Sequence, residues 1–147
     1  LWFDHVFSIR GWAEMVEEYG GDDDVHLFDR LFLGGAQTMR GFKYRHVGPI
    51  DEATGEPLGG KSGAMVQLEY TIPVVSMLRV AGFYDIGNVW ADPYQFDLGD
   101  YCTDIGLGVR LDFPAFPIRV DYAWPLEVPE NAYRTNPRFN FTMGYDF

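Results

Sequence analysis

The fold of this chain is decided by its last stretch, Arg138-Phe139-Asn140-Phe141-Thr142-Met143-Gly144-Tyr145-Asp146-Phe147. From Phe139 onward every odd position is aromatic or Met, and every even position is polar, charged or Gly. A period of two predicts a β-strand with one apolar and one polar face. Such a strand is typical of a soluble sheet or of a transmembrane barrel, and the rest of the chain favours the barrel. The terminal signal of that barrel strand would be Phe139, Phe141, Tyr145 and Phe147.

The composition suits strands joined by tight turns. The 147 residues are a one-domain length, and the chain is 17% aromatic with 17 Gly and 9 Pro. No apolar run approaches the roughly 18 residues of a transmembrane helix. Only a β-barrel, which hides its apolar band in alternation, could carry this chain through a bilayer.

The charge of the chain argues against nucleic acid as a partner. The net charge is -11 at pH 7, whereas a phosphate-binding surface needs a basic stripe. Acidic residues gather in expected loops, as in Asp22-Asp23-Asp24 and Asp51-Glu52. The single Cys102 has no partner for an internal disulfide. The start on Leu1-Trp2-Phe3, without an initiator Met, indicates a mature C-terminal piece of a longer protein.

Apolar and polar residues alternate in several separate segments of the chain. They are Val6–Met15, Ala64–Ile72, Leu78–Trp90, Ile105–Phe113, Ile118–Trp124 and Arg138–Phe147. The connections run long, short, long, short, long, which is the rhythm of an outer-membrane barrel with long outer loops and short periplasmic turns. Six antiparallel strands are fewer than the roughly eight of a small barrel. We therefore expect an open sheet whose two edges pair with other strands, because unpaired backbone groups are not tolerated in lipid.

The parity of the alternation assigns each side chain to a face of the sheet. The residues expected on the apolar, outward face are Leu68, Tyr70, Tyr84, Ile86, Leu107, Val109, Val120, Tyr122, Phe141 and Tyr145. Glu69 and Asp85 fall on the polar face of their strands. We therefore expect these two carboxylates to point into one interior.

Patterns that suggest catalysis or metal binding do not fit their context. Gly55-Glu56-Pro57-Leu58-Gly59-Gly60-Lys61-Ser62 matches the phosphate-loop pattern G-x-x-x-x-G-K-[ST]. A phosphate loop needs a buried strand before it and a helix after it, whereas here a polar turn precedes and period-two alternation follows. His5, His26 and His46 have no ligand spacing to each other or to Cys102. We expect no catalytic residue, no metal site and no cofactor, and we do not expect an enzyme.

Two glycine-containing elements carry a family resemblance. They are Phe32-Leu33-Gly34-Gly35-Ala36-Gln37-Thr38-Met39-Arg40-Gly41-Phe42 and Phe83-Tyr84-Asp85-Ile86-Gly87-Asn88-Val89-Trp90. The first resembles the F-x-G-G-x-x-x-x-R-G-F element in the largest loop of the BamA-like outer-membrane assembly barrels. The positions that match it are Gly34, Gly35, Arg40, Gly41 and Phe42. The second resembles the aromatic-x-D-x-G element of a later strand, and the similarity continues in family order over essentially the whole chain.

The resemblance implies both a fold and a function. The fold would be an all-β, antiparallel up-and-down transmembrane β-barrel, of which this chain supplies about six C-terminal strands of sixteen. Residues 1–147 would form this C-terminal part, with a long loop at about 18–62 folded into the lumen. The function would be to insert other barrel proteins into the bacterial outer membrane by templating a strand at a barrel seam. The partners would be outer-membrane lipids, client β-barrel polypeptides and periplasmic or accessory assembly proteins.

Arg40 is the residue expected to dock this loop. Glycines around it let the backbone turn back tightly, and Phe42 would anchor the tip by its apolar ring. The planar guanidinium can pair with both Glu69 and Asp85, and such charge-assisted bonds gain strength away from bulk water. We therefore expect Arg40 on the polar face of the sheet, within salt-bridge reach of Asp85 and with Glu69 as a second acceptor.

Three alternatives remain open from the sequence. A barrel of the same superfamily could secrete a polypeptide through its pore, or could anchor a patatin-type lipase encoded upstream. A soluble extracellular β-sandwich binding module is the alternative from a different class. Alternation does not separate it from a barrel, because the apolar face of a strand packs on a second sheet in one case and on lipid in the other.

Overall fold

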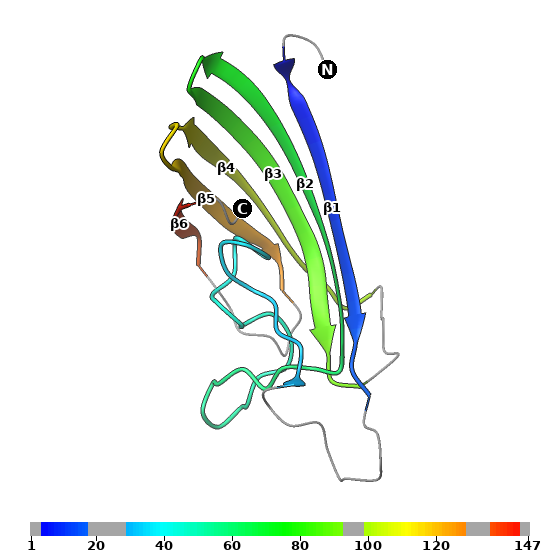
Figure 1. The fold of residues 1–147 in the computed structure, drawn as a ribbon. Coiled ribbons are helices and arrows are strands. Elements are labelled where there is room, and N and C mark those ends of the chain that lie inside the picture. The colour runs from blue at the N-terminus through cyan, green and yellow to red at the C-terminus, as the bar shows by residue number, and fades with distance from the viewer. Residues whose placement is uncertain (1–3, 18–28, 93–98, 129–135, 145–147) are drawn as a thin grey trace.

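Six antiparallel strands make one curved sheet (Figure 1). The computed structural model describes residues 4–17, 29–92, 99–128 and 136–144. The strands are β1 (Val6–Met15), β2 (Ser62–Val75), β3 (Leu78–Trp90), β4 (Cys102–Asp112), β5 (Pro117–Glu127) and β6 (Arg138–Met143). They pair in chain order, from β1 at one edge to β6 at the other. The predicted all-β antiparallel fold is confirmed, and the described strands form an open sheet as their number predicts.

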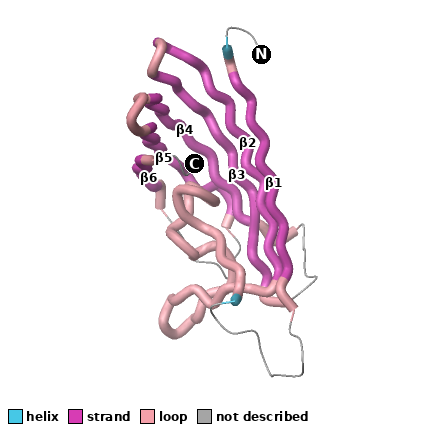
Figure 2. Tube along the Cα trace, viewed as in Figure 1, coloured by secondary structure: helices cyan, strands magenta, loops and turns pink. Residues whose placement is uncertain are grey.

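Short and long connections leave the sheet at opposite ends. The β2–β3 and β4–β5 hairpins lie at one end of the sheet, and the described parts of the three long connections lie at the other (Figure 2). This arrangement follows from the antiparallel order, because every second connection returns to the same end. Among the described residues, no helix has the length and apolar character needed to cross a membrane.

Two strands are longer than the alternation predicts. β2 and β5 extend beyond the predicted Ala64–Ile72 and Ile118–Trp124. Each passes through a proline, Pro73 or Pro125, that lies beside a register shift in the ladder. Proline is tolerated at such irregular positions because the ladder there does not need its missing N–H group. Both predicted segments end one residue before these prolines, whereas the strands of the structure continue through them.

The fourth strand is shifted toward the N-terminus. The sequence predicts Ile105–Phe113, whereas β4 spans Cys102–Asp112. The predicted segment begins after Asp104, a residue type that is disfavoured in strands. The structure places Asp104 within the strand, fully buried, and this change matters for the site described below.

The last strand is shorter than predicted. β6 ends at Met143, and the next residue, Gly144, has a φ of 127°, which is not an extended conformation. Phe139 and Phe141 lie on the outward face of β6 and are 64% and 59% exposed. The remaining residues of the predicted terminal signal, Tyr145 and Phe147, lie outside the described residues.

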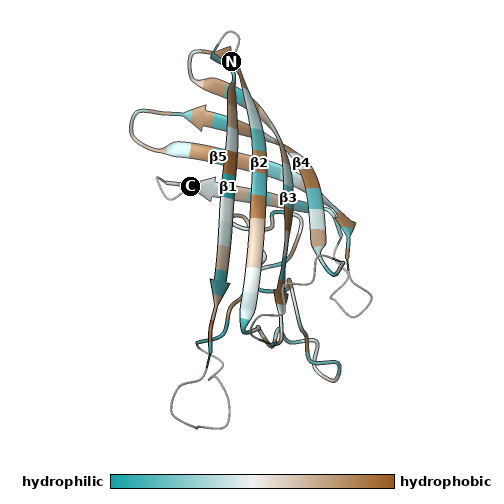
Figure 3. Ribbon diagram, turned by 90° about the vertical axis from the view of Figure 1, so that its right-hand side faces the viewer, coloured by the Kyte–Doolittle hydropathy of each residue, from teal (hydrophilic) through white to brown (hydrophobic). Residues whose placement is uncertain are grey.

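The two faces of the sheet differ as the parity predicts. On the outward face, Leu107 and Tyr122 are 60% and 42% exposed. On the inward face, Gln67 and Asp121 are buried. Figure 3 shows hydrophobic and hydrophilic residues alternating along the strands. The predicted face assignment is therefore confirmed for the described strands, while Tyr145 falls outside them.

The core lies between the sheet and the long segment that joins β1 to β2. We refer to residues 29–61 of that segment as the docked loop, and part of this loop folds back against the concave side of the sheet (Figure 1). The buried apolar residues of this core are Leu31, Leu33, Met39, Phe42 and Val47 from the docked loop and Met65, Val89 and Cys102 from the sheet. The docked loop therefore packs on the concave face of the sheet and forms the core with it.

Candidate loop-docking site

The tip of the docked loop is a tight turn that depends on two glycines. Gly34 and Gly35 have φ of 116° and 110°, a region that favours glycine. The N–H of Gly35 donates to the carbonyl oxygens of Met39 and Phe42 at 3.1 and 3.0 Å. The N–H of Gly34 donates to Thr38 Oγ1 at 2.9 Å. These bonds close the turn and present its last residues to the sheet.

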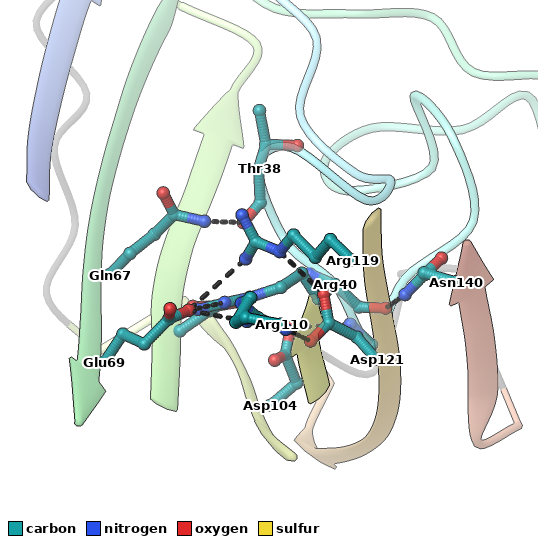
Figure 4. Close-up of polar contacts among 11 residues, drawn as sticks. Thr38, Arg40, Gln67, Glu69, Asp104, Arg110, Arg119, Asp121 and Asn140 are labelled. Carbon is teal, nitrogen blue, oxygen red and sulfur yellow. Dashed lines mark hydrogen bonds and ion pairs between the residues drawn. The ribbon is translucent and has the colours of Figure 1, made fainter. Parts of the chain in front are cut away.

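Arg40 lies at this tip with its guanidinium against the concave face (Figure 4). Its Nε and Nη2 atoms donate to the two carboxylate oxygens of Asp85 at 2.8 and 2.5 Å. Its Nη1 atom donates to Glu69 Oε2 at 2.5 Å. The guanidinium carbon also lies 3.6 Å from the centroid of the Phe83 ring. One planar fork therefore binds one carboxylate in bidentate fashion and reaches a second one with its remaining nitrogen.

The electrostatics of Arg40 follow from its burial and its two partners. The side chain is 1% exposed, and burial by itself would lower its pKa because desolvation disfavours the charged form. Hydrogen bonds and charges from Asp85 and then Glu69 outweigh this effect and hold the pKa of Arg40 above its ordinary value. The fully buried Asp85 thus faces a permanent cation.

The backbone at the tip is held as well as the side chain. The N–H of Arg40 donates to Asp85 Oδ2 at 3.2 Å, and the N–H of Gly41 donates to Asp104 Oδ2 at 2.9 Å. Asn140 Nδ2 on β6 donates to the carbonyl oxygen of Arg40 at 2.8 Å. A Cβ atom added to Gly41 would lie 2.5 Å from the Cβ of Asp104. Only glycine allows the tip to approach β4 this closely.

Phe42 anchors the tip on its apolar side. It is 1% exposed and packs in a cluster with Met39, Val47, Met65 and Val89. Full burial of such a side chain is worth about 1.5–3 kcal/mol. The loop is therefore held by an ionic contact on one side of Gly41 and by an apolar contact on the other.

Arg110 and Arg119 extend the ionic network beyond the residues that the sequence analysis singled out (Figure 4). Arg110 donates to Glu69 Oε2 at 2.9 Å and to Asp121 Oδ1 at 2.6 Å. Arg119 donates to Asp121 Oδ2 at 2.9 Å and to Glu69 Oε2 at 3.3 Å. One oxygen of Glu69 thus accepts bonds from Arg40, Arg110 and Arg119.

Sequence reasoning missed the part played by five residues of this site, Asp104, Arg110, Arg119, Asp121 and Asn140. One signal was available for the two arginines. Arg110 and Arg119 face each other across the short β4–β5 hairpin. Like charges in that position repel, so their pairing implies a carboxylate near both. For Asn140 no comparable signal exists, because its partner is 100 residues away in the chain.

The other candidate residues have local roles. His5 Nδ1 lies 2.6 Å from the Tyr70 hydroxyl, and His46 Nδ1 lies 2.7 Å from a backbone carbonyl oxygen. His26 lies outside the described residues. The phosphate-loop-like stretch Gly55–Ser62 leads directly into β2 and is not followed by a helix. Within the described part of the chain, no group of His, Cys, Asp and Glu side chains could hold a metal ion.

Comparison with known proteins identifies the family. The Omp85 superfamily domain matches residues 2–147. The chain belongs to the Omp85 superfamily. The resemblance to the BamA-like assembly barrels is thereby confirmed.

Two curated relatives show how far the similarity of this Omp85 chain extends. It is 32% identical over 146 residues to the outer membrane protein assembly factor BamA of Nitratidesulfovibrio vulgaris, which covers 97% of this chain and 18% of that protein. It is 31% identical over 103 residues to the human sorting and assembly machinery component 50 homolog, which covers 70% of this chain and 21% of that protein. The chain thus spans about a fifth of the length of these relatives.

A solved structure shows the same fold. The crystal structure of BamA from Haemophilus ducreyi lacking POTRA domains 1-3 superimposes with a TM-score of 0.72 at 20% identity, over 95% of this chain and 31% of that one. The Omp85 chain therefore has the fold of part of an antiparallel transmembrane β-barrel. The superfamily match and the identity to BamA place it in the bacterial outer membrane. The alternative of a soluble β-sandwich is wrong, because the described strands form one barrel-type sheet.

Proposed function

We propose that this Omp85 chain is the C-terminal part of a barrel insertase, which assembles other β-barrel proteins in the outer membrane without covalent chemistry. The observation that carries the proposal is its 32% identity, over nearly all its residues, to a protein named as an outer membrane protein assembly factor. The human relative is likewise named as a component of an assembly machinery. Client β-barrel polypeptides, membrane lipids and periplasmic or accessory assembly proteins are the proposed partners.

The proposed mechanism uses the free edge of β6. This strand pairs with β5 on one side, and among the described strands none pairs with its other side. Unpaired N–H and C=O groups can add an incoming strand by β-augmentation. They are also costly in lipid. An edge of this kind at a barrel seam would therefore favour pairing with a client strand that brings its own backbone groups.

The proposed role of the docked loop is to brace the barrel from inside. Arg40 reaches β2 and β3 through Glu69 and Asp85, and Gly41 reaches β4 through Asp104. We place a loop at about 18–62 in the lumen of the complete barrel, with residues 1–147 as the C-terminal part of that barrel. Gly34, Gly35 and Phe42 would serve the same role by shaping and anchoring the tip.

The test uses the full-length protein reconstituted in lipid vesicles. A urea-denatured client barrel is added, and its insertion is followed by the appearance of a membrane-embedded, protease-protected form. We expect faster insertion than in empty vesicles and a loss of this acceleration in the Arg40→Ala variant. Arg79→Ala is the matched control, because Arg79 forms only a half-exposed contact of 3.8 Å with Asp112.

The same experiment separates the insertase from its relatives in the superfamily. A secretion pore would carry the added polypeptide into the vesicle interior, where protease cannot reach it although it is not embedded in lipid. A barrel that only anchors an enzyme would accelerate neither process. Either result would overturn the proposed function.

A further inference from the structure

The last described strand contacts the docked loop through a side-chain amide. Asn140 lies on the inward face of β6, and its Nδ2 atom donates to the carbonyl oxygen of Arg40 at 2.8 Å. Figure 4 shows Asn140 reaching from β6 toward the backbone of Arg40. The contact therefore joins the loop tip to a strand that none of the Arg40 side-chain bonds reaches.

The carbonyl group that Asn140 binds is fixed by other strands. The N–H and the guanidinium of Arg40 are bound to Asp85 on β3, and the following N–H, from Gly41, is bound to Asp104 on β4. The carbonyl group that accepts the bond from Asn140 is therefore already fixed in position. Forming this hydrogen bond costs less conformational entropy than forming one to a mobile group. If the loop tip undocks, this acceptor leaves with it.

β6 has few other contacts to hold it in place. Its ladder with β5, from Ile118↔Met143 to Ala123↔Arg138, is the shortest in the sheet, and its other edge is open among the described strands. Thr142 is the next inward-facing residue after Asn140, and it makes no hydrogen bond to the loop within the described residues. The loss of one bond at the centre of so short a strand should therefore be measurable.

We propose that Asn140 is a positioning residue that couples the docked loop to β6. While Arg40 is docked, the amide of Asn140 holds β6 in register with β5, and when the loop tip undocks, β6 loosens. Coupling of this kind is reciprocal, so loss of the Asn140 bond also loosens the loop tip. The inference rests on the proposed function, in which the edge of β6 accepts a client strand. It adds that docking of the loop would set how readily that edge opens.

Amide hydrogen exchange in the full-length protein in lipid vesicles tests this coupling. Asn140→Asp keeps the size of the side chain and removes its N–H donor, and Asn140→Leu provides a second variant without any hydrogen-bonding group. We expect exchange over Phe139–Met143 to become about two- to tenfold faster in each variant. Exchange over residues 38–42 of the loop tip should also become faster. Thr142→Val is the matched control on the same face of β6 and should leave both regions unchanged.

A double variant distinguishes coupling from local loosening. Arg40→Ala should also speed exchange over β6, and adding Asn140→Asp should give no further increase, because the shared contact is already lost. Unchanged β6 exchange in Asn140→Asp and Asn140→Leu would overturn the inference. It would also be overturned if the effects of Arg40→Ala and Asn140→Asp on the logarithm of the rate simply added.

The failure of this inference is separable from the failure of the proposed function. Hydrogen exchange needs no client protein, and it decides whether Asn140 couples loop and strand. The vesicle insertion assay, run on wild-type protein, decides whether the barrel is an insertase.

Discussion

Asp85 and Asp104 face each other as cross-strand partners on β3 and β4, and both side chains are fully buried. Two ionised carboxylates in this position would repel each other without water to screen them. The loop tip compensates both, because Arg40 binds Asp85 and the N–H of Gly41 binds Asp104. Docking of the loop and pairing of β3 with β4 therefore stabilise each other.

Replacement of Arg40 by alanine should destabilise the barrel strongly. It removes the cation that Asp85 and Glu69 share and leaves the buried Asp85 without its bidentate partner, at an expected cost of about 3 kcal/mol. Urea unfolding of the full-length protein measures this change, and the vesicle assay should show a parallel loss of client insertion. Arg79→Ala should change stability by less than about 0.5 kcal/mol. The reverse pair, Arg40→Asp with Asp85→Arg, should restore part of both properties. An Arg40→Ala protein as stable as the wild type would contradict the docking role.

The two carboxylates should respond differently once Arg40 is gone. Glu69 keeps bonds to Arg110 and Arg119, whereas Asp85 is fully buried and loses its bidentate partner. We therefore expect Asp85→Asn to recover about 1–3 kcal/mol of the loss in an Arg40→Ala background, because it removes an unpaired buried charge. Glu69→Gln should recover nothing in the same background. Urea midpoints of the two double variants, compared with Arg40→Ala alone, check the prediction, and equal recovery by both would disprove it.

A single methyl group at Gly41 should displace the loop tip. The Cβ of Gly41→Ala would lie 2.5 Å from the Cβ and 3.0 Å from the Cγ of Asp104, so backbone must move. Overpacking of this kind costs about 1–3 kcal/mol. Gly11→Ala is the control, because an added Cβ there meets no atom within 4 Å. Thermal unfolding of both variants should separate them, and the account of Gly41 fails if the two behave alike.

Replacement of Arg110 by lysine should destabilise the protein. Two different nitrogens of Arg110 reach Glu69 on β2 and Asp121 on β5, and a single ammonium group does not reproduce this geometry. We expect Arg110→Lys to lose about 1–3 kcal/mol of stability. Arg10→Lys serves as the control, because Arg10 is exposed on the edge strand β1. Equal stabilities of the two lysine variants in urea would show that the charge alone is sufficient at position 110.

A charged residue on the outward face should hinder membrane insertion more strongly the deeper its position lies in the bilayer. Leu107 lies in the middle of β4 and is 60% exposed on the apolar side of the sheet. Leu107→Arg should cost about 2–4 kcal/mol, whereas Met77→Arg in the β2–β3 turn should cost at most about 1 kcal/mol. Refolding yields into lipid vesicles at a series of urea concentrations provide the measurement. A larger effect at Met77 than at Leu107 would reverse the assigned membrane depth.

Much of the fold follows from local patterns in the sequence. Alternation with a period of two is a property of a strand by itself, so the six strands, their faces and the alternation of short and long connections could be predicted. Errors arose where local preference and tertiary context disagreed. Pro73 and Pro125 lie inside strands because register shifts accommodate them, and Asp104 lies inside β4 because the loop tip supplies its partner.

The sequence by itself determined that this chain forms antiparallel strands with Glu69 and Asp85 on the polar face, since strand parity depends only on neighbouring residues. The resemblance of residues 32–42 to a family element pointed to Arg40, but its contacts depend on how the loop folds across the sheet. Only the tertiary structure decided that Asp104 holds Gly41, that Arg110 and Arg119 share Glu69, and that Asn140 binds the Arg40 carbonyl. These contacts join residues up to 100 positions apart. They depend on strand register and sheet curvature, which no local pattern encodes.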